Sequence, residues 1–355
     1  MKIAFLSFYS GIVYRGVETY VHELADRLCA MGNDVIVYQN GQDVYKGKYK
    51  TITIGTKYTN LKSGKLALFL NKFTGFNANM RFTQKVLSQL DKDTDFVIAT
   101  NNKIQAFLAR IWCLGKKAKL VISGQSGPGI DERFALYCFP DVFIPLSEFQ
   151  RKWAKRINRF VYVSDVIHNG VSLEKFSKII EKEKFGLNGK IILCAAAFWP
   201  DTKRQDLLIR AVSKLEGVSL ILAGDGEGKE YLKNLGERIL GKRFMIKSFP
   251  YQLMPKVYAS ADLFSFPTVS WESFGIVMVE AMASNLPVVA TDDPIRREIV
   301  GNAGIFIDPE NTEAYTEALR KALSISWGDK PRRQAEKFSW DIIAEKYEEL
   351  FKELL

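Results

Sequence analysis

The sequence predicts an α/β fold of two domains, each an open parallel sheet covered by helices, and three observations lead to this prediction. The chain has 355 residues, which is more than one core of ordinary size holds. Short apolar segments alternate with segments of helical periodicity, which is typical of a parallel sheet covered by helices on both faces. The alternation starts at the N-terminus and starts again after a turn at His168–Gly170. We therefore expect an N-terminal domain of residues 1–168 and a C-terminal domain of residues 169–337.

The first domain opens with a buried strand followed by an amphipathic helix. Apolar residues at helical spacing predict a helix over Val17–Met31, and Gly32 is suited to end it. The predicted strands of this domain are Lys2–Phe8, Asp34–Tyr38, Phe96–Ala99, Leu120–Ser123 and Val142–Pro145.

The second domain repeats the same order. Its predicted strands are Lys190–Ala195, Val218–Ala223, Phe244–Ile246, Leu263–Phe266 and Pro287–Ala290. Its predicted helices are Gln205–Leu215, Tyr231–Ile239, Leu253–Ser260, Gly275–Ser284 and Thr312–Ser324, and an amphipathic helix at Trp340–Leu354 closes the chain. Two open sheets in tandem leave a cleft at the carboxyl ends of their strands, where sheets of this kind bind ligands.

Composition excludes several classes of site and partner. The four cysteines are scattered without a CxxC pair and there are two histidines, so we expect neither a disulfide framework nor a metal site. The net charge of +10 predicts an anionic partner, but no nucleic-acid-binding module accompanies it, so we do not expect nucleic acid. The first residues are typical of a strand rather than a signal peptide, and no apolar run spans a bilayer, so we expect a cytoplasmic protein.

The most informative segment is Pro267–Pro287, PTVSWESFGIVMVEAMASNLP. A strand ends before it and a helix opens at about Gly275, so the first free amides of that helix form an anion site. Glu272 lies just before the helix and Glu280 lies inside it, and eight helical residues span roughly 12 Å. That length suits one carboxylate on the hydroxyls of a transferred sugar and the other on the ribose of a nucleotide. Two solvated glutamates beside a buried helix are the alternative.

Two further segments are candidates for binding phosphate. Lys203, in the segment that follows the first strand of the second domain, can neutralise a diphosphate leaving group. Gly16 opens the first helix and can bring its backbone against a phosphate, although a plain tight turn explains it equally well. The glycines of Gly224–Gly228 have the spacing GxGxG rather than GxGxxG, so we expect a structural loop that faces the cleft.

At these residues the chain resembles the family-4 retaining glycosyltransferases of the GT-B fold, nearly end to end. The matching pieces are RGVETYVHELADRLCAMGNDV, HNGV, DTKRQDLL, LAGDGE, YASADLFSFPTVSWESFGIVMVEAMASNLPVVAT and FSW, and ESFGIVMVE corresponds to the E-x7-E motif of that family. The resemblance implies a hexosyltransferase that works without a metal and keeps the anomeric configuration. It also implies an α/β fold of two Rossmann-like domains with a cleft between them, and a last helix, within residues 338–355, that crosses back to the first domain.

Carried over position by position, the resemblance implies a donor site mostly in the second domain. Lys203 contacts the diphosphate and Glu272 the donor sugar, as the catalytic pair, while Glu280 binds the ribose. Gly16 covers the phosphates from the first domain. The other residues implied at the donor site are Arg204, Phe249, Pro250, Ser273, Phe274, Gly275, Ile276 and Val277, with Phe249 and Pro250 at the base. The implied partner is a UDP- or GDP-sugar, with no cofactor. The acceptor is left open, and lipid-linked or cell-surface glycan precursors are the candidates.

The chain departs from the family pattern at three places. Many members carry an arginine where this chain has Ala197, and that arginine shares the diphosphate with the lysine. Many carry a first-domain histidine where this chain has Ser123–Gly127. A loop that is often glycine-rich is Asp292–Arg297 here. Alternative functions therefore stay open: a nucleotide-sugar epimerase, a phosphorylase, or a protein that binds nucleotide sugars without catalysis.

Two amphipathic basic segments suggest peripheral contact with an anionic membrane. Leu61–Phe76 mixes lysines with phenylalanine and leucine, and Phe149–Phe160 places aromatic residues among basic ones. Packing of both apolar stripes on the first sheet is the alternative, and it is favoured for both. Asp91-Lys92-Asp93 matches the letters of a metal-binding DxD motif, but it stands in a polar turn and is expected to be solvated.

Overall fold

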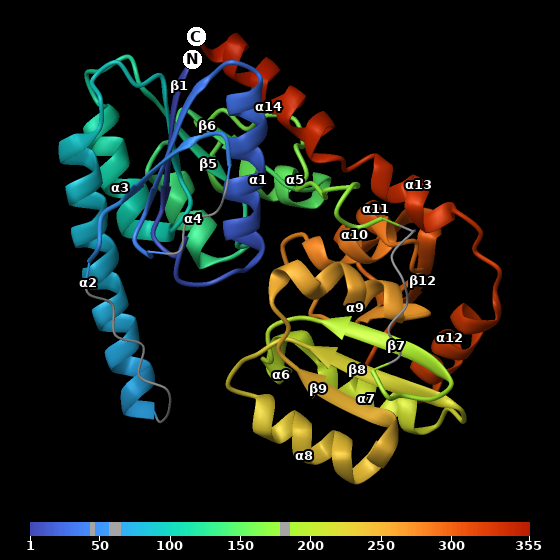
Figure 1. The fold of residues 1–355 in the computed structure, drawn as a ribbon. Coiled ribbons are helices and arrows are strands. Elements are labelled where there is room, and N and C mark those ends of the chain that lie inside the picture. Colours follow the sequence, from blue (N-terminus) through green and yellow to red (C-terminus); the bar gives the residue numbers. More distant parts are fainter. Residues whose placement is uncertain (43–46, 57–64, 178–184) are drawn as a thin grey trace. The chain divides into compact units, whose positions relative to one another are not determined.

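The computed structural model describes residues 1–42, 47–56, 65–177 and 185–355, and gives only the backbone for residues 65–76 and 102. The chain forms two compact units (Figure 1). The first consists of Met1–Asn169 and Trp340–Leu355, and the second of Gly170–Ser339. Within the described residues, every helix is too short or too polar to cross a lipid bilayer.

The first unit is a six-stranded parallel sheet in the order β3-β2-β1-β4-β5-β6. Its strands are β1 (Lys2–Ser7), β2 (Asp34–Gln39), β3 (Lys50–Thr53), β4 (Phe96–Ala99), β5 (Lys119–Ser123) and β6 (Val142–Ile144). Its helices are α1 (Gly16–Ala30), α2 (Lys65–Gln89), α3 (Asn102–Cys113), α4 (Ile130–Tyr137), α5 (Glu148–Ile157) and α14 (Trp340–Leu354). Helices α2 and α3 cover one face of the sheet and α1 and α14 the other (Figure 1).

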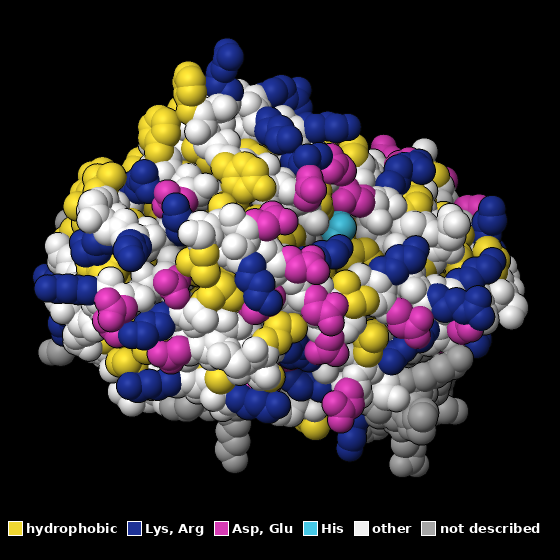
Figure 2. All heavy atoms as spheres, turned by 90° about the horizontal axis from the view of Figure 1, so that it is seen from above, with side chains coloured by type: hydrophobic (Ala, Val, Ile, Leu, Met, Phe, Trp, Pro, Cys, Tyr) yellow, Lys and Arg dark blue, Asp and Glu magenta, His cyan; other side chains and the backbone are white. Residues whose placement is uncertain are grey.

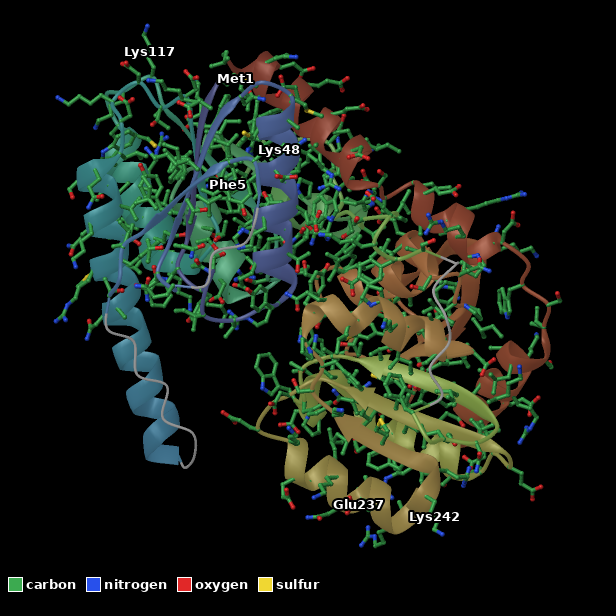
Figure 3. The ribbon with its side chains drawn as sticks, in the orientation of Figure 1. Met1, Phe5, Lys48, Lys117, Glu237 and Lys242 are labelled. Carbon is green, nitrogen blue, oxygen red and sulfur yellow. The ribbon has the colours of Figure 1, made fainter. Side chains whose placement is uncertain are left out.

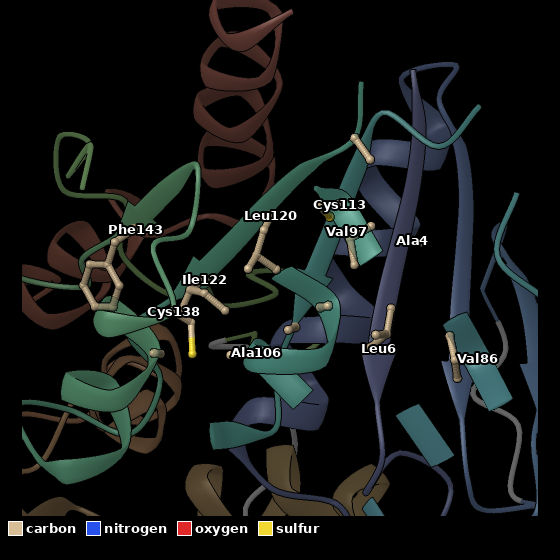
Figure 4. Close-up of a cluster of buried hydrophobic side chains, with 14 of the residues drawn as sticks. Ala4, Leu6, Val86, Val97, Ala106, Cys113, Leu120, Ile122, Cys138 and Phe143 are labelled. Carbon is tan, nitrogen blue, oxygen red and sulfur yellow. The ribbon is translucent and has the colours of Figure 1, made fainter. Parts of the chain in front are cut away.

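Apolar side chains on both faces of this sheet explain why its strands are nearly continuous hydrophobic runs. Phe5 of β1 is fully buried inside the unit, whereas Lys117 projects from its outside (Figure 3). On the face covered by α2 and α3, Leu6 and Val97 from neighbouring strands pack against Val86 of α2 (Figure 4). Burial of this kind contributes roughly 25 cal/mol per Å² of apolar surface and fixes the sheet as the frame of the unit.

The last helix, α14, packs on the first unit although it follows the second along the chain. Trp340 and Tyr347 lie against Tyr20 of α1, with ring centroids 6.4 and 6.1 Å away. The rings of Phe351 and Phe96 stack at 4.3 Å. The predicted return of the C-terminal helix to the first domain is therefore confirmed, and its aromatic face supplies the reason.

The second unit has the same architecture, with strand order β12-β11-β10-β7-β8-β9. Its strands are β7 (Lys190–Ala195), β8 (Val218–Ala223), β9 (Phe244–Lys247), β10 (Leu263–Phe266), β11 (Val288–Thr291) and β12 (Gly304–Ile307). Its helices are α6 (Pro200–Lys203), α7 (Gln205–Ser213), α8 (Lys229–Leu240), α9 (Met254–Ser260), α10 (Ile276–Ala283), α11 (Pro294–Val300), α12 (Thr312–Ser324) and α13 (Lys330–Glu336). All strand pairs are parallel, so the carboxyl ends of the strands share one edge.

The predicted fold class of two Rossmann-like α/β domains is confirmed, and the structure adds elements that the sequence analysis left out. These include the partly buried edge strands β3, the polar segment KTIT without an apolar run, and β12, the short apolar segment GIFI. The segment Asp292–Arg297 was expected to be a loop, and that expectation is wrong because α11 starts at Pro294. Asp293 caps this helix and proline occupies its first position, a combination that starts helices.

Candidate active site

Lys203 and Glu272 form an ion pair at the carboxyl edge of the second sheet. Nζ of Lys203 lies 2.5 Å from Oε2 of Glu272, and the two side chains are 13% and 24% exposed. Lys203 ends the short helix after β7, and Glu272 stands in the loop after β10, the neighbouring strand. The ammonium also lies 5.6 Å from the centre of the Phe266 ring. The pair thus stands where open α/β sheets bind ligands, with enough exposure to reach one.

Hydrogen bonds join the two segments that carry this pair, the short helix α6 and the loop after β10. The carbonyl oxygen of Thr202 accepts from the amide of Val269 at 2.9 Å and from the hydroxyl of Thr268 at 3.0 Å. Thr202 precedes Lys203, and Thr268 and Val269 precede Glu272 by a few residues. The position of one charged side chain relative to the other is therefore set by backbone contacts as well as by the ion pair.

The glycine-rich loop after β8 supports the segment that leads to Lys203. A Cβ atom on Gly224 would lie 2.0 Å from the carbonyl oxygen of Ala196, and one on Gly228 would lie 2.5 Å from the Pro200 ring. The amide of Gly228 donates to the carbonyl of Phe198 at 2.9 Å. Only glycine permits so close an approach of the two backbones, so these contacts give the loop a packing role.

The N-terminus of α10 lies beside the ion pair in sequence and presents free amides. Gly275 is the residue before the helix and has a positive φ of 78°, a conformation that glycine adopts without strain. A Cβ there would also approach Met278 Cε to 2.9 Å. The amides of the first helical turn, on Ile276 and Val277, have no partner within the helix, and the helix dipole makes this end positive. The first turn carries no acidic residue, so the site suits an anion.

Glu280 projects from α10 into a buried polar cluster and is 4% exposed. The hydroxyl of Tyr258 donates to its Oε2 at 2.8 Å, and the hydroxyl of Tyr251 approaches its Oε1 at 3.5 Å. Burial, reinforced by the Glu280 charge, raises the pKa of Tyr258 well above its ordinary value, which keeps this phenol a hydrogen-bond donor. The carboxylate is consequently held in one orientation by a neutral donor.

The other expected donor-site residues are dispersed. Arg204 pairs with Glu310, whereas the adjacent Lys203 pairs with Glu272. Phe249 is half-buried, with Lys247 Nζ 5.3 Å from its ring centre, and Pro250 after it is exposed. Gly16 lies in the first unit, where it is the first residue of α1.

The residues between Glu272 and Gly275 are buried. Ser273 is 8% exposed and Phe274 2% exposed. The ring of Phe274 packs edge-on against Phe338 at 5.9 Å, so its side chain belongs to the core of the unit.

Arg296 of α11 is a site residue that the sequence analysis missed. It is fully buried, and its guanidinium donates to the backbone carbonyls of Ser270 and Glu272 at 3.0 Å each. Its Nε donates to the carboxylate of Asp293 at 2.8 Å. The spacing of Asp293 and Arg296, three residues apart after a helix-starting Asp-Pro, was the available signal. The contact with the loop of Glu272 had no signal in the sequence.

The apparent DxD motif lies in the first unit, at the amino ends of the strands rather than at their carboxyl ends. Asp91 and Asp93 face Nζ of Lys2, at 2.9 and 3.9 Å, at the amino end of β1. The hydrogen bond from Lys2 lowers the pKa of Asp91. Both carboxylates are exposed, and ligands of such sheets bind at the carboxyl edge, so this pair is a surface ion pair.

The family model described as "Glycosyl transferases group 1" matches residues 175–339. Residues 175–339 are therefore similar to a group 1 glycosyl transferase domain. They hold the described residues of the arrangement around Lys203, Glu272 and Glu280, all of which lie in the second unit.

Curated relatives extend the likeness beyond these residues, in one case to most of the chain. An exopolysaccharide phosphotransferase of Streptomyces coelicolor is 29% identical over 233 residues, which is 61% of this chain and 24% of that protein. A phosphatidyl-myo-inositol mannosyltransferase of Mycobacterium leprae is 25% identical over 341 residues, 90% of this chain and 86% of that protein. The chain thus spans about a quarter of the length of the first of these relatives and most of the second.

Solved structures share the fold of the whole chain. The HepE protein of Anabaena, in complex with UDP and glucose, superposes with a TM-score of 0.77 at 18% identity and covers 99% of both chains. At 18% identity this similarity shows the fold alone, and the fold agrees with two Rossmann-like units.

Proposed function

We propose that this protein is a glycosyltransferase that moves a hexosyl group from a nucleotide diphosphate sugar, UDP- or GDP-linked, to a hydroxyl acceptor. The observation that carries the proposal is the Lys203–Glu272 pair next to the open N-terminus of α10, with Glu280 inside the same helix. A cation and free amides suit a diphosphate, and two carboxylates at this spacing suit sugar and ribose hydroxyls. The names of the relatives, a mannosyltransferase among them, support the same class of reaction.

In this proposal the leaving group is the nucleoside diphosphate. Negative charge builds on its β-phosphate as the bond to the sugar breaks, and Lys203 with the amides of Gly275–Val277 stabilises that charge without reorganisation. Glu272 accepts hydrogen bonds from the donor sugar and orients it, and Glu280 accepts from the ribose. Lys203 then exchanges part of its contact with Glu272 for the phosphate.

The proposed reaction keeps the anomeric configuration and needs no metal. The charge on the diphosphate is met by side chains and amides, so a divalent cation is not required for neutralisation. NMR of the first-formed product tests the stereochemistry, and an inverted anomeric centre would refute it.

The nucleotide specificity is tested by thermal denaturation with UDP, GDP, ADP and their sugars. A ligand that binds the folded state raises its stability according to its concentration over its Kd. Incubation of the best donor with candidate acceptors then separates an enzyme from a binding protein. Stabilisation by the donor, with neither transfer to an acceptor nor hydrolysis, would favour the non-catalytic alternative.

We further propose that the protein works in the cytoplasm, in peripheral contact with an anionic membrane that holds its acceptor. The segment Leu61–Phe76, first considered for this contact, lies outside the described residues as far as its side chains are concerned. The described part offers another apolar face, on the adjacent helices α3 and α4. Its exposed side chains recur at helical spacing on one side of each helix: Phe107, Ile111 and Leu114, and Ile130, Phe134 and Tyr137.

Lysine and arginine side chains accompany hydrophobic ones on the surface in Figure 2, notably at its upper left. A basic surface with exposed apolar groups binds anionic bilayers through burial of the apolar groups and through electrostatic attraction. Salt screens the electrostatic attraction. Flotation with vesicles containing phosphatidylglycerol should recover the protein at low salt and less of it at high salt. Equal recovery with neutral vesicles would remove this proposal and leave the glycosyltransferase proposal intact.

A further inference from the structure

The guanidinium of Arg296 is completely buried, and this placement is energetically demanding. Its side chain is 0% exposed and that of its partner Asp293 is 2% exposed. A buried charge is costly unless hydrogen bonds and an opposite charge compensate it, and replacing such pairs by apolar residues is often neutral or stabilising. The pair is therefore weak evidence for stability, and its other contacts indicate what it does.

The guanidinium divides its donors between two backbone segments. Nε faces Asp293, whose other oxygen caps α11 by accepting from the amides of Ile295 and Arg296 at 2.9 and 3.0 Å. The two terminal nitrogens reach across to the loop after β10 and donate to the carbonyls of Ser270 and Glu272. One planar group thus ties the start of α11 to the loop that carries the Glu272 carboxylate.

The loop after β10 is anchored at its two ends, by Thr268 and Val269 on Thr202 and by the buried Phe274, and its middle has fewer contacts. The side chains of Ser270 and Trp271 are exposed, Trp271 by 59%, so hydrophobic packing does not hold this part of the loop. Before it, the hydroxyl of Thr291 donates to the carbonyl of Thr268 at 2.5 Å, which anchors the loop where it leaves the sheet. Further along the loop, Arg296 holds the backbone through the carbonyl oxygens of Ser270 and Glu272.

We propose that Arg296 is a positioning residue, which holds the backbone of Glu272 so that its carboxylate meets Lys203 and the donor sugar. This inference deepens the proposed glycosyltransferase function and rests on it for the catalytic consequence. A misplacement of about 1 Å can lower a reaction rate about 100-fold. The loss of this anchor is therefore expected to lower kcat. A lysine cannot replace it, because one ammonium group does not reproduce a fork that serves three acceptors.

The test compares Arg296→Lys and Arg296→Met with Arg297→Met. Arg297 is the next residue of the same helix, its side chain is 58% exposed, and it pairs with Asp292 on the surface. Amide hydrogen exchange is measured over residues 268–275, UDP affinity by calorimetry, and turnover as hydrolysis of or transfer from UDP-glucose and GDP-mannose. Asp293→Asn, which keeps the shape of the partner and removes its charge, serves as a milder second variant.

Both Arg296 variants should speed exchange at residues 269–273 by at least about tenfold, with kcat lower by about 10- to 100-fold. UDP affinity should change less than about threefold, because the amides of α10 and Glu280 are left in place. Combining Arg296→Lys with Glu272→Gln should cost little beyond Glu272→Gln alone, because both changes act through one carboxylate. Arg297→Met should leave all these measurements unchanged.

Exchange at 269–273 equal to that of Arg297→Met would overturn the inference, whether or not a donor is turned over. Loss of UDP affinity in step with kcat, together with additive effects in the double variant, would equally overturn it and leave only a general structural role. Absence of turnover by the unaltered protein with every donor and acceptor would instead count against the proposed function.

Discussion

The hydroxyl of Tyr258 lies 2.8 Å from Oε2 of Glu280, and both groups are buried within the second unit. Because Glu280 is the carboxylate proposed to bind the ribose, the tyrosine controls a contact that it does not itself make. A buried carboxylate that loses a donor carries an uncompensated desolvation cost, which favours its protonated form and another orientation.

Replacement of this tyrosine should therefore weaken nucleotide binding. Tyr258→Phe is expected to lower UDP or GDP affinity by about tenfold, in line with the loss of one hydrogen bond to a charged group. Tyr315→Phe is the matched control, since the Tyr315 hydroxyl is also buried in this unit but faces Ser265 at 2.7 Å. Calorimetric titration of both variants checks the prediction, and equal affinities would contradict it.

Glu280→Gln should act mainly on donor binding. The ribose does not change charge during the reaction, so its contacts are the same in the ground state and the transition state. Steady-state kinetics should show a KM for the donor raised by about tenfold or more and kcat changed by less than about threefold. A large fall in kcat at saturating donor would place Glu280 in the chemical step instead.

Lys203→Ala should lower kcat by about two to three orders of magnitude, comparable with the loss of one oxyanion donor. Ala197 cannot supply a second cation, so Lys203 bears more of the leaving-group charge. Arg204→Ala should cost less than about tenfold, because the Arg204 guanidinium pairs with Glu310. If Lys203→Ala retains more than about a tenth of the original kcat, the assignment of the leaving-group site is wrong.

Transfer should continue in EDTA. The proposed diphosphate site consists of a lysine and backbone amides, and neither depends on a divalent ion. Initial rates with and without the chelator, after dialysis, decide the matter. Loss of activity that magnesium or manganese restores would contradict the prediction.

Glu132 should make the folded state less stable as pH rises. Burial raises its pKa from 4.5 to about 8, so between these values the unfolded chain releases a proton that the folded chain keeps. His22 has the opposite effect only below its ordinary value of 6.5, because burial lowers its pKa to about 4. Between pH 6.5 and 8, Glu132→Gln should therefore flatten the decline of stability with pH. Urea denaturation of both proteins at several pH values tests this, and parallel curves would refute it.

Much of the fold could be predicted because apolar patterning is local. Strands such as Leu263–Phe266 and the closing helix Trp340–Leu354 agree with the structure residue for residue. The edge strand β3 was missed because its residues, KTIT, form no apolar run, whereas β12, GIFI, is a short apolar segment that the prediction left unassigned. Helix α11 was not predicted because its segment corresponds to a loop that is often glycine-rich in the resembling family. The Asp293-Pro294 pair was the local signal for the start of a helix.

The sequence by itself determined the two α/β units, the helix that presents its amides after Gly275, and the candidates Lys203, Glu272 and Glu280. These follow from periodicity, glycine placement and spacing, which are properties of neighbouring residues. Only the tertiary structure decided which partners these side chains have: Lys203 with Glu272, Glu280 with Tyr258, and the buried Arg296 with the loop of Glu272. Such pairs are 22 to 69 residues apart, and the crossovers between parallel strands that bring them together leave no periodic trace in the sequence.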